Sequence, residues 1–276
     1  MALETFEKIY IENCDDFSPQ DIFECGQAFR WNADENGSYT GIAFGTVAKV
    51  HNENGRICIE SSDGSYEKVW HAYFDMERDY GELRREISRE KKLSAACEFG
   101  KGIRILNQEP WEALCSFIIS QCNNIPRIKG IVEKLCMLCG DEIEFMGKTY
   151  HAFPAAESIA ALSMKELDLL RSGYRAAYIS EAAKGVADGS INLKAIKSLP
   201  TDAAKKELLK IPGVGEKVAS CTLLFGLGKL DAFPVDVWMK RAISEFFGEE
   251  KFDYRRFGKY AGLAQQYMFH YMRNGR

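Results

Sequence analysis

A short turn between two helical segments carries the residues best suited to chemistry. Residues 208–221 read LLKIPGVGEKVASC, so a helical pattern ends, a Pro-Gly-x-Gly turn follows and a second helix begins. Gly213, Val214 and Gly215 leave backbone N–H groups uncovered at the positive end of that second helix. Such an end suits a DNA phosphate. The pattern is typical of a helix-hairpin-helix, although a plain helical hairpin with a glycine turn shares it.

Lys217 stands in the first turn of the second helix, where the helix dipole disfavours a cation. A lysine made neutral by that dipole and by burial is a nucleophile. Cys221 follows one helical turn later, so the two side chains share a face. A solvated surface lysine is the ordinary alternative reading.

Asp236 is a single acid in the apolar frame AFPVDV. A carboxylate there can stabilise a cationic sugar transition state and shuttle protons. It can equally act as the N-cap of a helix over Trp238–Phe247, and the two roles are compatible.

Hydrophobic periodicity predicts an α+β chain in two parts, domain 1–103 and domain 104–276. Residues 39–50 and 56–60 are rich in β-branched and aromatic residues and follow Asn-Gly turn signals, which indicates an antiparallel sheet. A charged helical pattern over 75–100 flanks that sheet, and the rest of the chain is predicted to be all-α. The predicted helices of that body span 111–119, 126–139, 162–170, 179–186, 201–209 and 217–225.

Composition and charge narrow the class of protein. Hydrophobic residues make up 46% and charged residues 28% of the chain, as in a folded globular protein. No apolar run approaches the ~20 residues that span a bilayer, and the N-terminus shows no secretory signal, so we expect an intracellular protein. Residues 1–100 hold 11 basic and 20 acidic residues, whereas 101–276 hold 25 and 20, so any polyanion is expected to bind the second part.

The nine cysteines are irregularly spaced and fit reduced, mostly buried thiols better than a disulfide framework. Cys136 and Cys139 form a C-x-x-C pair within an apolar helical pattern. No second cysteine pair completes a metal site. We therefore favour the interpretation that both thiols pack in the core over a role in metal binding or redox chemistry.

PGVGEK followed by PVDV resembles the helix-hairpin-helix–Gly/Pro–Asp superfamily of base-excision glycosylases, and within it the 8-oxoguanine DNA glycosylase family. Further matches in the family's order extend the resemblance over nearly the whole chain. The resemblance implies a TBP-like N-terminal antiparallel sheet domain joined to a helical body that contains the hairpin. The matching segments are GQAFRW at 26–31, NNIPR at 123–127, GYRA at 173–176 and YAGLAQ at 260–265, with Phe269.

The resemblance implies that Lys217 attacks C1′ of a flipped-out nucleotide, that a Schiff base forms, and that β-elimination nicks the strand. Asp236 matches the residue that stabilises the sugar cation. Gly26 matches the glycine whose carbonyl accepts the N7–H that 8-oxoguanine has and guanine lacks. Gln265 matches the reader of the Watson–Crick edge. Cys221 and Phe269 match the two faces of the base sandwich.

On the opposite strand, the resemblance assigns Arg127 and Arg175 to the unpaired cytosine. It assigns Asn123 to the gap left by the flipped base and Tyr174 to the kinked step as a wedge. Cys122 departs from the family pattern, which has a third asparagine there. A thiol is a weak partner for a base edge, so we expect a relaxed opposite-base preference. Trp238 replaces a frequent histidine near a phosphate.

Several alternatives are weighed against this interpretation. Endonuclease III-like and adenine-glycosylase-like relatives carry a four-cysteine iron–sulfur cluster after the PVDV segment, and no cysteine follows Cys221. The 3-methyladenine type lacks the lysine. A non-catalytic helix-hairpin-helix module would explain the turn but leaves Lys217, Asp236, Gly26 and Gln265 without a role. We expect a monomer that binds duplex DNA containing 8-oxoguanine and requires no cofactor. In this superfamily the hairpin can hold a monovalent cation. Because the ligands are backbone carbonyls, the residue types do not show whether a cation binds.

Overall fold

A five-stranded antiparallel sheet forms the first part of the computed structural model, which describes residues 6–12, 15–62, 64–248 and 252–275. The strand order is β1-β5-β4-β3-β2. The run 39–50 divides at Phe44-Gly45, where both residues have positive φ and make a two-residue hairpin turn. The strands are β1 (Phe6–Ile11), β2 (Trp31–Ala33), β3 (Tyr39–Ala43), β4 (Thr46–Glu53) and β5 (Arg56–Ser62).

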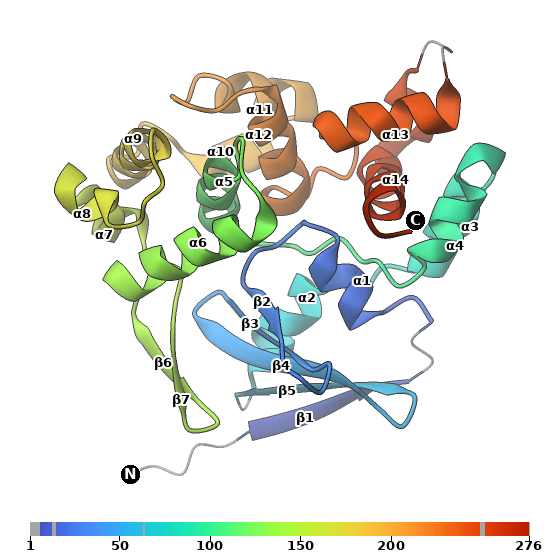
Figure 1. Ribbon diagram of the computed structural model, residues 1–276, viewed down its shortest axis with the longest axis horizontal. Helices are drawn as coiled ribbons and strands as arrows, with labels where there is room; N and C mark the ends of the chain where they lie inside the picture. The colour runs from blue at the N-terminus through green and yellow to red at the C-terminus, as the bar shows by residue number, and fades with distance from the viewer. Residues whose placement is uncertain (1–5, 13–14, 63, 249–251, 276) are drawn as a thin grey trace.

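One face of this sheet is covered by α1 (Pro19–Glu24) and by the π-helical turn η1 (Tyr66–Trp70), which continues as α2 (His71–Tyr73). Figure 1 shows α1 and α2 between the sheet and the helical body. Aromatic packing dominates this core: the ring of Trp31 stacks on Phe23 with 3.9 Å between centroids. The sheet is therefore fixed to the rest of the molecule through its inner face.

The segment predicted as a charged helix over 75–100 forms α3 (Tyr80–Ile87), the 3₁₀ turn η2 (Lys91–Leu93) and α4 (Ser94–Phe99). Leu83, Leu93 and Cys97 belong to the core of the helical body and not to that of the sheet. These helices flank the sheet in sequence, but their apolar faces are buried against the C-terminal helices.

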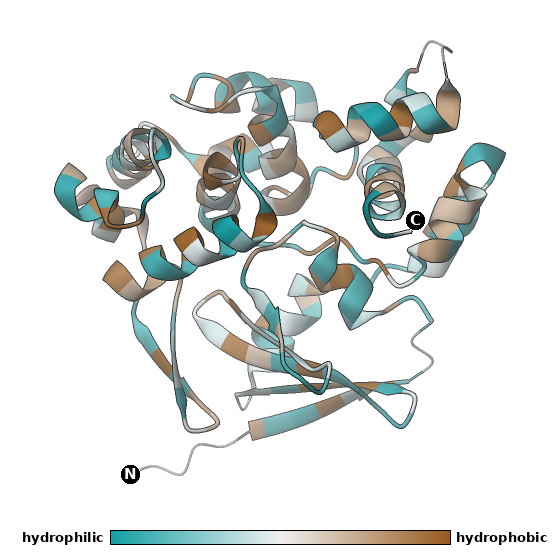
Figure 2. Ribbon diagram, viewed as in Figure 1, coloured by the Kyte–Doolittle hydropathy of each residue, from teal (hydrophilic) through white to brown (hydrophobic). Residues whose placement is uncertain are grey.

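The second part is a body of short helices around α5, in which Trp111 to Ile119 are all buried. The predicted helices are all present, with shifted ends, and Lys217–Phe225 is divided between an α-helix and a π-helical turn. Figure 2 shows hydrophobic and hydrophilic residues alternating around the helices and along the strands. The elements are α5 (Pro110–Ile119), α6 (Ile125–Cys139), α7 (Ala156–Ala160), α8 (Met164–Asp168), α9 (Arg175–Ala187), α10 (Leu193–Ser198), α11 (Thr201–Leu208), α12 (Glu216–Cys221), η3 (Thr222–Gly226), α13 (Val237–Phe247), η4 (Tyr254–Tyr260) and α14 (Ala261–Asn274).

The helical body also carries a two-stranded hairpin that the periodicity did not predict, β6 (Glu142–Phe145) and β7 (Lys148–His151). Its turn, Met146-Gly147, has positive φ at both residues. Phe145 is 1% exposed and packs with Ile42 and Val47 on the outer face of the large sheet. The body is therefore not purely helical, because this hairpin reaches across to the first part.

Eight cysteines lie in the described residues and all are free thiols, as predicted; Cys14 lies outside those residues. Cys136 is buried, and the Sγ of Cys139 donates to the Leu135 carbonyl 3.6 Å away. Among the described helices, none combines the length and apolar character that crossing a membrane requires.

Candidate active site

Of the two glycines in the turn between α11 and α12, Gly213 has the conformation that requires glycine, whereas Gly215 has a φ of −93° and does not. Gly213 has a φ of +80°, and a Cβ added there would lie 2.2 Å from Cγ of Tyr178. Gly215 is the N-cap of α12, supplies no capping side chain and is surrounded by open space. The first N–H groups of α12 therefore face outward without a side-chain cap. Val214 differs, because its N–H donates to the Ile211 carbonyl at 3.0 Å and its side chain is buried.

Lys217 is half-buried in the first turn of α12, as predicted. Its Nζ donates to Oγ of Ser120 at 2.8 Å and lies 5.1 Å from the ring centroid of Phe117. The Ser120 hydroxyl in turn donates to the Phe117 carbonyl at 2.8 Å. Ser120 is the C-cap of α5, so the amine rests at the negative end of that helix. This contact positions Nζ without an ion pair.

Asp236 is the N-cap of α13, and its Oδ1 accepts the Met239 N–H at 2.8 Å. The capping role predicted for this residue is confirmed, with the helix beginning one residue earlier, at Val237. The cap uses Oδ1 and fixes the orientation of the carboxylate, which lines a pocket together with Lys217. The same side chain can thus cap the helix and act on a bound molecule.

A pocket of about 50 Å³ brings together every residue predicted for catalysis and for the damaged base. A cavity needs about 10–15 Å³ of such space to hold one water, so this pocket admits only a few waters and is tight for a purine base. A larger groove of about 980 Å³ is also lined in part by Lys217, so this residue borders both cavities. The small pocket is lined by Gly26, Phe117, Lys217, Cys221, Phe225, Pro234, Asp236, Gln265, Gln266 and Phe269.

Gly26 reaches this pocket from the loop between α1 and β2. It has a φ of +78°, and a Cβ there would lie 3.3 Å from Cε1 of Phe269 on α14. The next residue, Gln27, is fully buried and anchors the loop: Nε2 donates to the Arg104 carbonyl at 2.8 Å, and Oε1 accepts the Leu106 N–H at 2.9 Å. The loop is held rigidly, so the first part of the chain supplies one wall of the pocket.

Cys221 and two adjacent glutamines make up the polar remainder of the pocket. Burial raises the pKa of the Cys221 thiol to about 11, and the nearby Lys217 ammonium partly opposes that rise. The thiol is therefore neutral at physiological pH. Gln265 is buried, and its Oε1 accepts from Nε2 of Gln266 at 2.9 Å. The Oε1 atom of Gln266 is buried without a hydrogen-bond partner.

The residues predicted for the opposite strand gather where the α5–α6 loop meets the start of α9. Arg175 is 4% exposed: Nε donates to the Gln121 carbonyl at 2.8 Å and Nη2 to the Cys122 carbonyl at 3.1 Å. In this conformation its guanidinium holds the loop and does not face solvent. Tyr174 is 53% exposed, and the Arg175 guanidinium lies 4.5 Å from its ring centroid.

Arg127 and Asn123 lie in the same patch. Arg127 is exposed, and its Nη2 donates to the Arg171 carbonyl at 3.2 Å. The amide of Asn123 is turned onto its own loop, since Nδ2 donates to the Ile119 carbonyl at 3.2 Å. Cys122 is exposed with a φ of +46°, beside Tyr174. Trp238 is 40% exposed on α13. The patch is formed, but Asn123, Arg127 and Arg175, three of its four predicted residues, donate hydrogen bonds to backbone carbonyls of the protein itself.

Sequence reasoning missed Ser120 and Gln266. Ser120 is separated from Lys217 by 97 positions, and only the packing of α5 on α12 brings them together. Gln266 directly follows a predicted pocket residue, so the Gln-Gln pair was the available signal. Phe117, Phe225 and Pro234 were also missed, because an apolar residue in a helical or loop pattern cannot be distinguished from ordinary core.

Comparison with known proteins divides the chain between two family models. Residues 9–114 match the model described as 8-oxoguanine DNA glycosylase, N-terminal domain. Residues 115–259 match that described as HhH-GPD superfamily base excision DNA repair protein. The models adjoin within α5, so together they cover both parts of the fold.

Individual relatives point the same way. A probable N-glycosylase/DNA lyase of Methanothermobacter thermautotrophicus is 30% identical over 235 residues, 75% of this chain and 73% of the relative. N-glycosylase/DNA lyase OGG1 of Arabidopsis thaliana is 28% identical, with 90% and 75% covered. The structure of Clostridium acetobutylicum 8-oxoguanine glycosylase/lyase, in complex with double-stranded DNA containing cytosine opposite 8-oxoG, has a TM-score of 0.91 and 38% identity. The match covers 100% of this chain and 99% of that one.

Proposed function

The chain belongs to the 8-oxoguanine DNA glycosylase family of the HhH-GPD superfamily, and on that premise we propose how its residues carry out the reaction. It is a bifunctional DNA glycosylase and AP lyase of base excision repair, which excises 8-oxoguanine from duplex DNA and then cleaves the strand. The observation that carries the residue assignments is the single pocket lined by Lys217, Asp236, Gly26, Cys221 and Gln265.

Lys217 is the nucleophile. Its Nζ loses a proton and attacks C1′, so that a C–N bond to the enzyme forms as the bond to the base breaks and the base leaves with a proton. Opening of the sugar ring gives a Schiff base, and loss of a proton from C2′ expels the 3′ phosphate by β-elimination. Asp236 stabilises the positive charge that develops on the sugar, from a position fixed by its capping bond. Ser120 holds the resting amine close to this point.

The base is recognised by the groups around the amine. The Gly26 carbonyl accepts the N7–H of 8-oxoguanine; guanine offers an acceptor there and leaves the carbonyl unpaired. Gln265 reads the Watson–Crick edge. Cys221, as a neutral thiol, and Phe269 contact the two faces of the base. Phe269 must move from beside Gly26, because the pocket is smaller than the base that it admits.

On the opposite strand, Tyr174 is the wedge, and Arg127 and Arg175 contact the unpaired base. Asn123 helps to fill the gap left by the flipped nucleotide. Arg175 contacts the unpaired base once its guanidinium releases the Gln121 carbonyl and donates to the base instead. Cys122 offers only a weak hydrogen bond, so the preference for cytosine is relaxed.

The hairpin contacts the DNA backbone through Gly213, Val214 and Gly215. The open N-terminus of α12 supports a phosphate there, with the contact at Val214 requiring its N–H to be released from Ile211. A monovalent cation bound by carbonyls of this turn would add charge at the same point. We also propose a monomer, and a division of the chain into domains 1–103 and 104–276, with the helices of 80–99 packed on the second.

Single-turnover assays on duplexes containing one 8-oxoguanine test this proposal. Base release and strand cleavage are followed separately, with cytosine, adenine, guanine or thymine opposite the lesion and an undamaged duplex as control. We expect release and cleavage with all four partners and rates within about tenfold of one another. A Cys122→Asn variant should restore a stronger cytosine preference. Strong cytosine preference in the wild type would contradict the role given to Cys122.

A further inference from the structure

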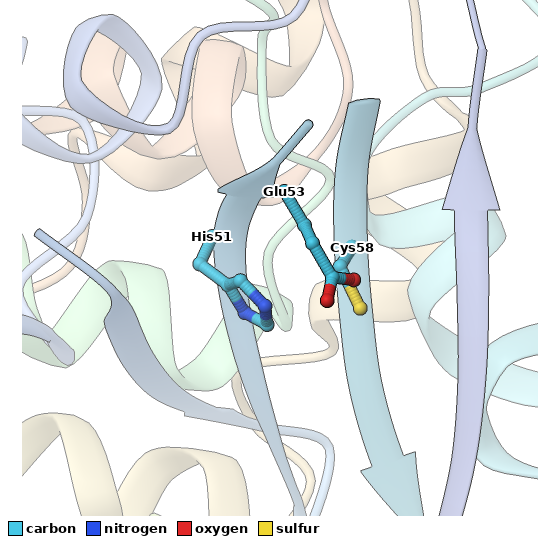
Figure 3. A group of neighbouring side chains, drawn as sticks. All are labelled: His51, Glu53 and Cys58. Atoms are coloured by element: carbon cyan, nitrogen blue, oxygen red, sulfur yellow. The ribbon is translucent and has the colours of Figure 1, made fainter. Parts of the chain in front are cut away.

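Three side chains with metal-ligating atoms meet on the outer face of the sheet. Ala48 and Val50 of β4 and Ile59 of β5 belong to the inner core, so the alternating residues of both strands face the other way. His51 and Glu53 lie on that outer face of β4. Cys58 of β5 is the direct cross-strand partner of His51. Figure 3 shows the imidazole, carboxylate and thiol turned toward one another from adjacent strands.

The ligand atoms of these residues all lie within 4.8 Å of one another. Cys58 is fully buried and the other two are half-buried. Both Nδ1 of His51 and Oε2 of Glu53 are buried without a hydrogen-bond partner. Buried polar atoms in native proteins are nearly always satisfied. Two such atoms facing the same thiol need a common partner, and a cation satisfies both at once.

We propose that His51, Glu53 and Cys58 form a zinc-binding site outside the active site. Imidazole nitrogen, thiolate sulfur and carboxylate oxygen are the three ligand types that Zn²⁺ takes in proteins, and water completes a tetrahedron. Bond lengths of about 2.0–2.3 Å place neighbouring ligand atoms roughly 3.5 Å apart. The observed separations, at most 4.8 Å, exceed that spacing by little, so small side-chain rotations on the paired strands reach it.

The site clips β4 to β5 next to their connecting turn, Asn54-Gly55. It lies on the face of the sheet opposite the inner core, whereas the Lys217 pocket is lined by the helical body and by Gly26 of the loop between α1 and β2. Metal binding is therefore expected to stabilise the sheet and to leave the chemistry at Lys217 unchanged. Tyr10 of β1 is the cross-strand partner of Cys58 on the side away from β4, and its hydroxyl interacts with Glu53 and Cys58.

Titration of the full-length protein with Zn²⁺ alone, followed by metal analysis after gel filtration, tests this site. We expect one Zn²⁺ per chain. Glu53→Gln and His51→Gln keep the side-chain size and should each weaken binding by about 100-fold or more, exceeding the effect usual for outer-shell changes. Co²⁺ in place of Zn²⁺ should give a thiolate charge-transfer band that Cys58→Ser abolishes.

Cys139→Ser is the matched control, because Cys139 belongs to the C-x-x-C pair, the other cysteine-based candidate. It should retain full zinc binding and the same rise in melting temperature with Zn²⁺ as the wild type. Circular dichroism of Glu53→Gln checks that its fold is intact. The proposal is overturned if the wild type binds no zinc, if both Gln variants bind it as tightly as the wild type, or if Cys139→Ser loses it.

Discussion

Gly26→Ala is the substitution that most sharply separates base recognition from the chemistry at Lys217. Gly26 has a φ of +78°, where an L-residue is strained by about 1–2 kcal/mol. The new Cβ would also stand 3.3 Å from Cε1 of Phe269, tighter than an ordinary contact. Phe269 lines the pocket of about 50 Å³, so a shift of its ring changes the space that the base enters.

Two losses should result. Stability should fall by about 1–3 kcal/mol, from backbone strain together with modest overpacking. The rate of 8-oxoguanine excision should fall as well, because the Gly26 carbonyl that accepts N7–H shifts. A single buried hydrogen bond left unmade is equivalent to about 1–3 kcal/mol, or roughly 5- to 150-fold in rate. Strand cleavage at a preformed abasic site should change little, since that substrate has no base to recognise.

The assay compares single-turnover rates on an 8-oxoguanine duplex and on an abasic-site duplex for the wild type, Gly26→Ala and Gly37→Ala. Gly37 has a φ of +76° in a hairpin turn with no atom within 4 Å of its added Cβ, so it reproduces the strain without touching the pocket. Gly37→Ala should lose stability and keep both rates. Equal loss on both substrates in Gly26→Ala, or full excision, would refute the reasoning.

Three further substitutions follow from the geometry of the pocket. Asp236→Asn keeps the α13 cap, since asparagine caps as well as aspartate, so stability should hold while excision falls about 100-fold or more; a melting curve beside a rate measurement checks both. Ser120→Ala removes the hydrogen-bond acceptor of the Lys217 amine and should slow Schiff-base formation about three- to tenfold without weakening DNA binding, whereas Ser120→Thr should restore the rate. Gln266→Leu removes a buried acceptor that has no partner but also the amide that donates to Oε1 of Gln265, so the two effects oppose each other and stability should change little by calorimetry; excision should still fall about three- to tenfold, because Gln265 loses the amide that orients it. Equal behaviour of Ser120→Ala and Ser120→Thr, or a Gln266→Leu variant as active as the wild type, would count against these roles.

The turn chemistry and the helix-start signals could be predicted from sequence because they are local. Gly213 is required by its own φ, and Asp236 caps the helix that begins at the next residue. The β6–β7 hairpin was missed because its strands are only four residues each, too short for an alternating pattern to stand out beside helical neighbours. Helices α3 and α4 were assigned to the sheet by sequence order, whereas their apolar faces pack on the helical body.

The active-site residues that belong to local sequence motifs could be predicted. Those that reach the site only through the packing of distant segments could not. Gly26 and Phe269 were expected in one pocket, and they line it together. Nothing in the sequence around Ser120 distinguishes it from a helix-capping serine, since its partner lies 97 positions away. For Arg175, the matching motif predicted contact with a base. In the structure its guanidinium instead donates to backbone carbonyls of the α5–α6 loop, which the sequence does not indicate.

Borohydride trapping tests the central claim most directly. The wild type and Lys217→Gln are each incubated with a duplex carrying one 8-oxoguanine opposite cytosine, in the presence of borohydride, and DNA binding is measured alongside. We predict a covalent protein–DNA band for the wild type and none for Lys217→Gln, with similar affinity for both. A band of equal strength in Lys217→Gln, or base release by the wild type without any trapped product, would contradict Lys217 as the nucleophile.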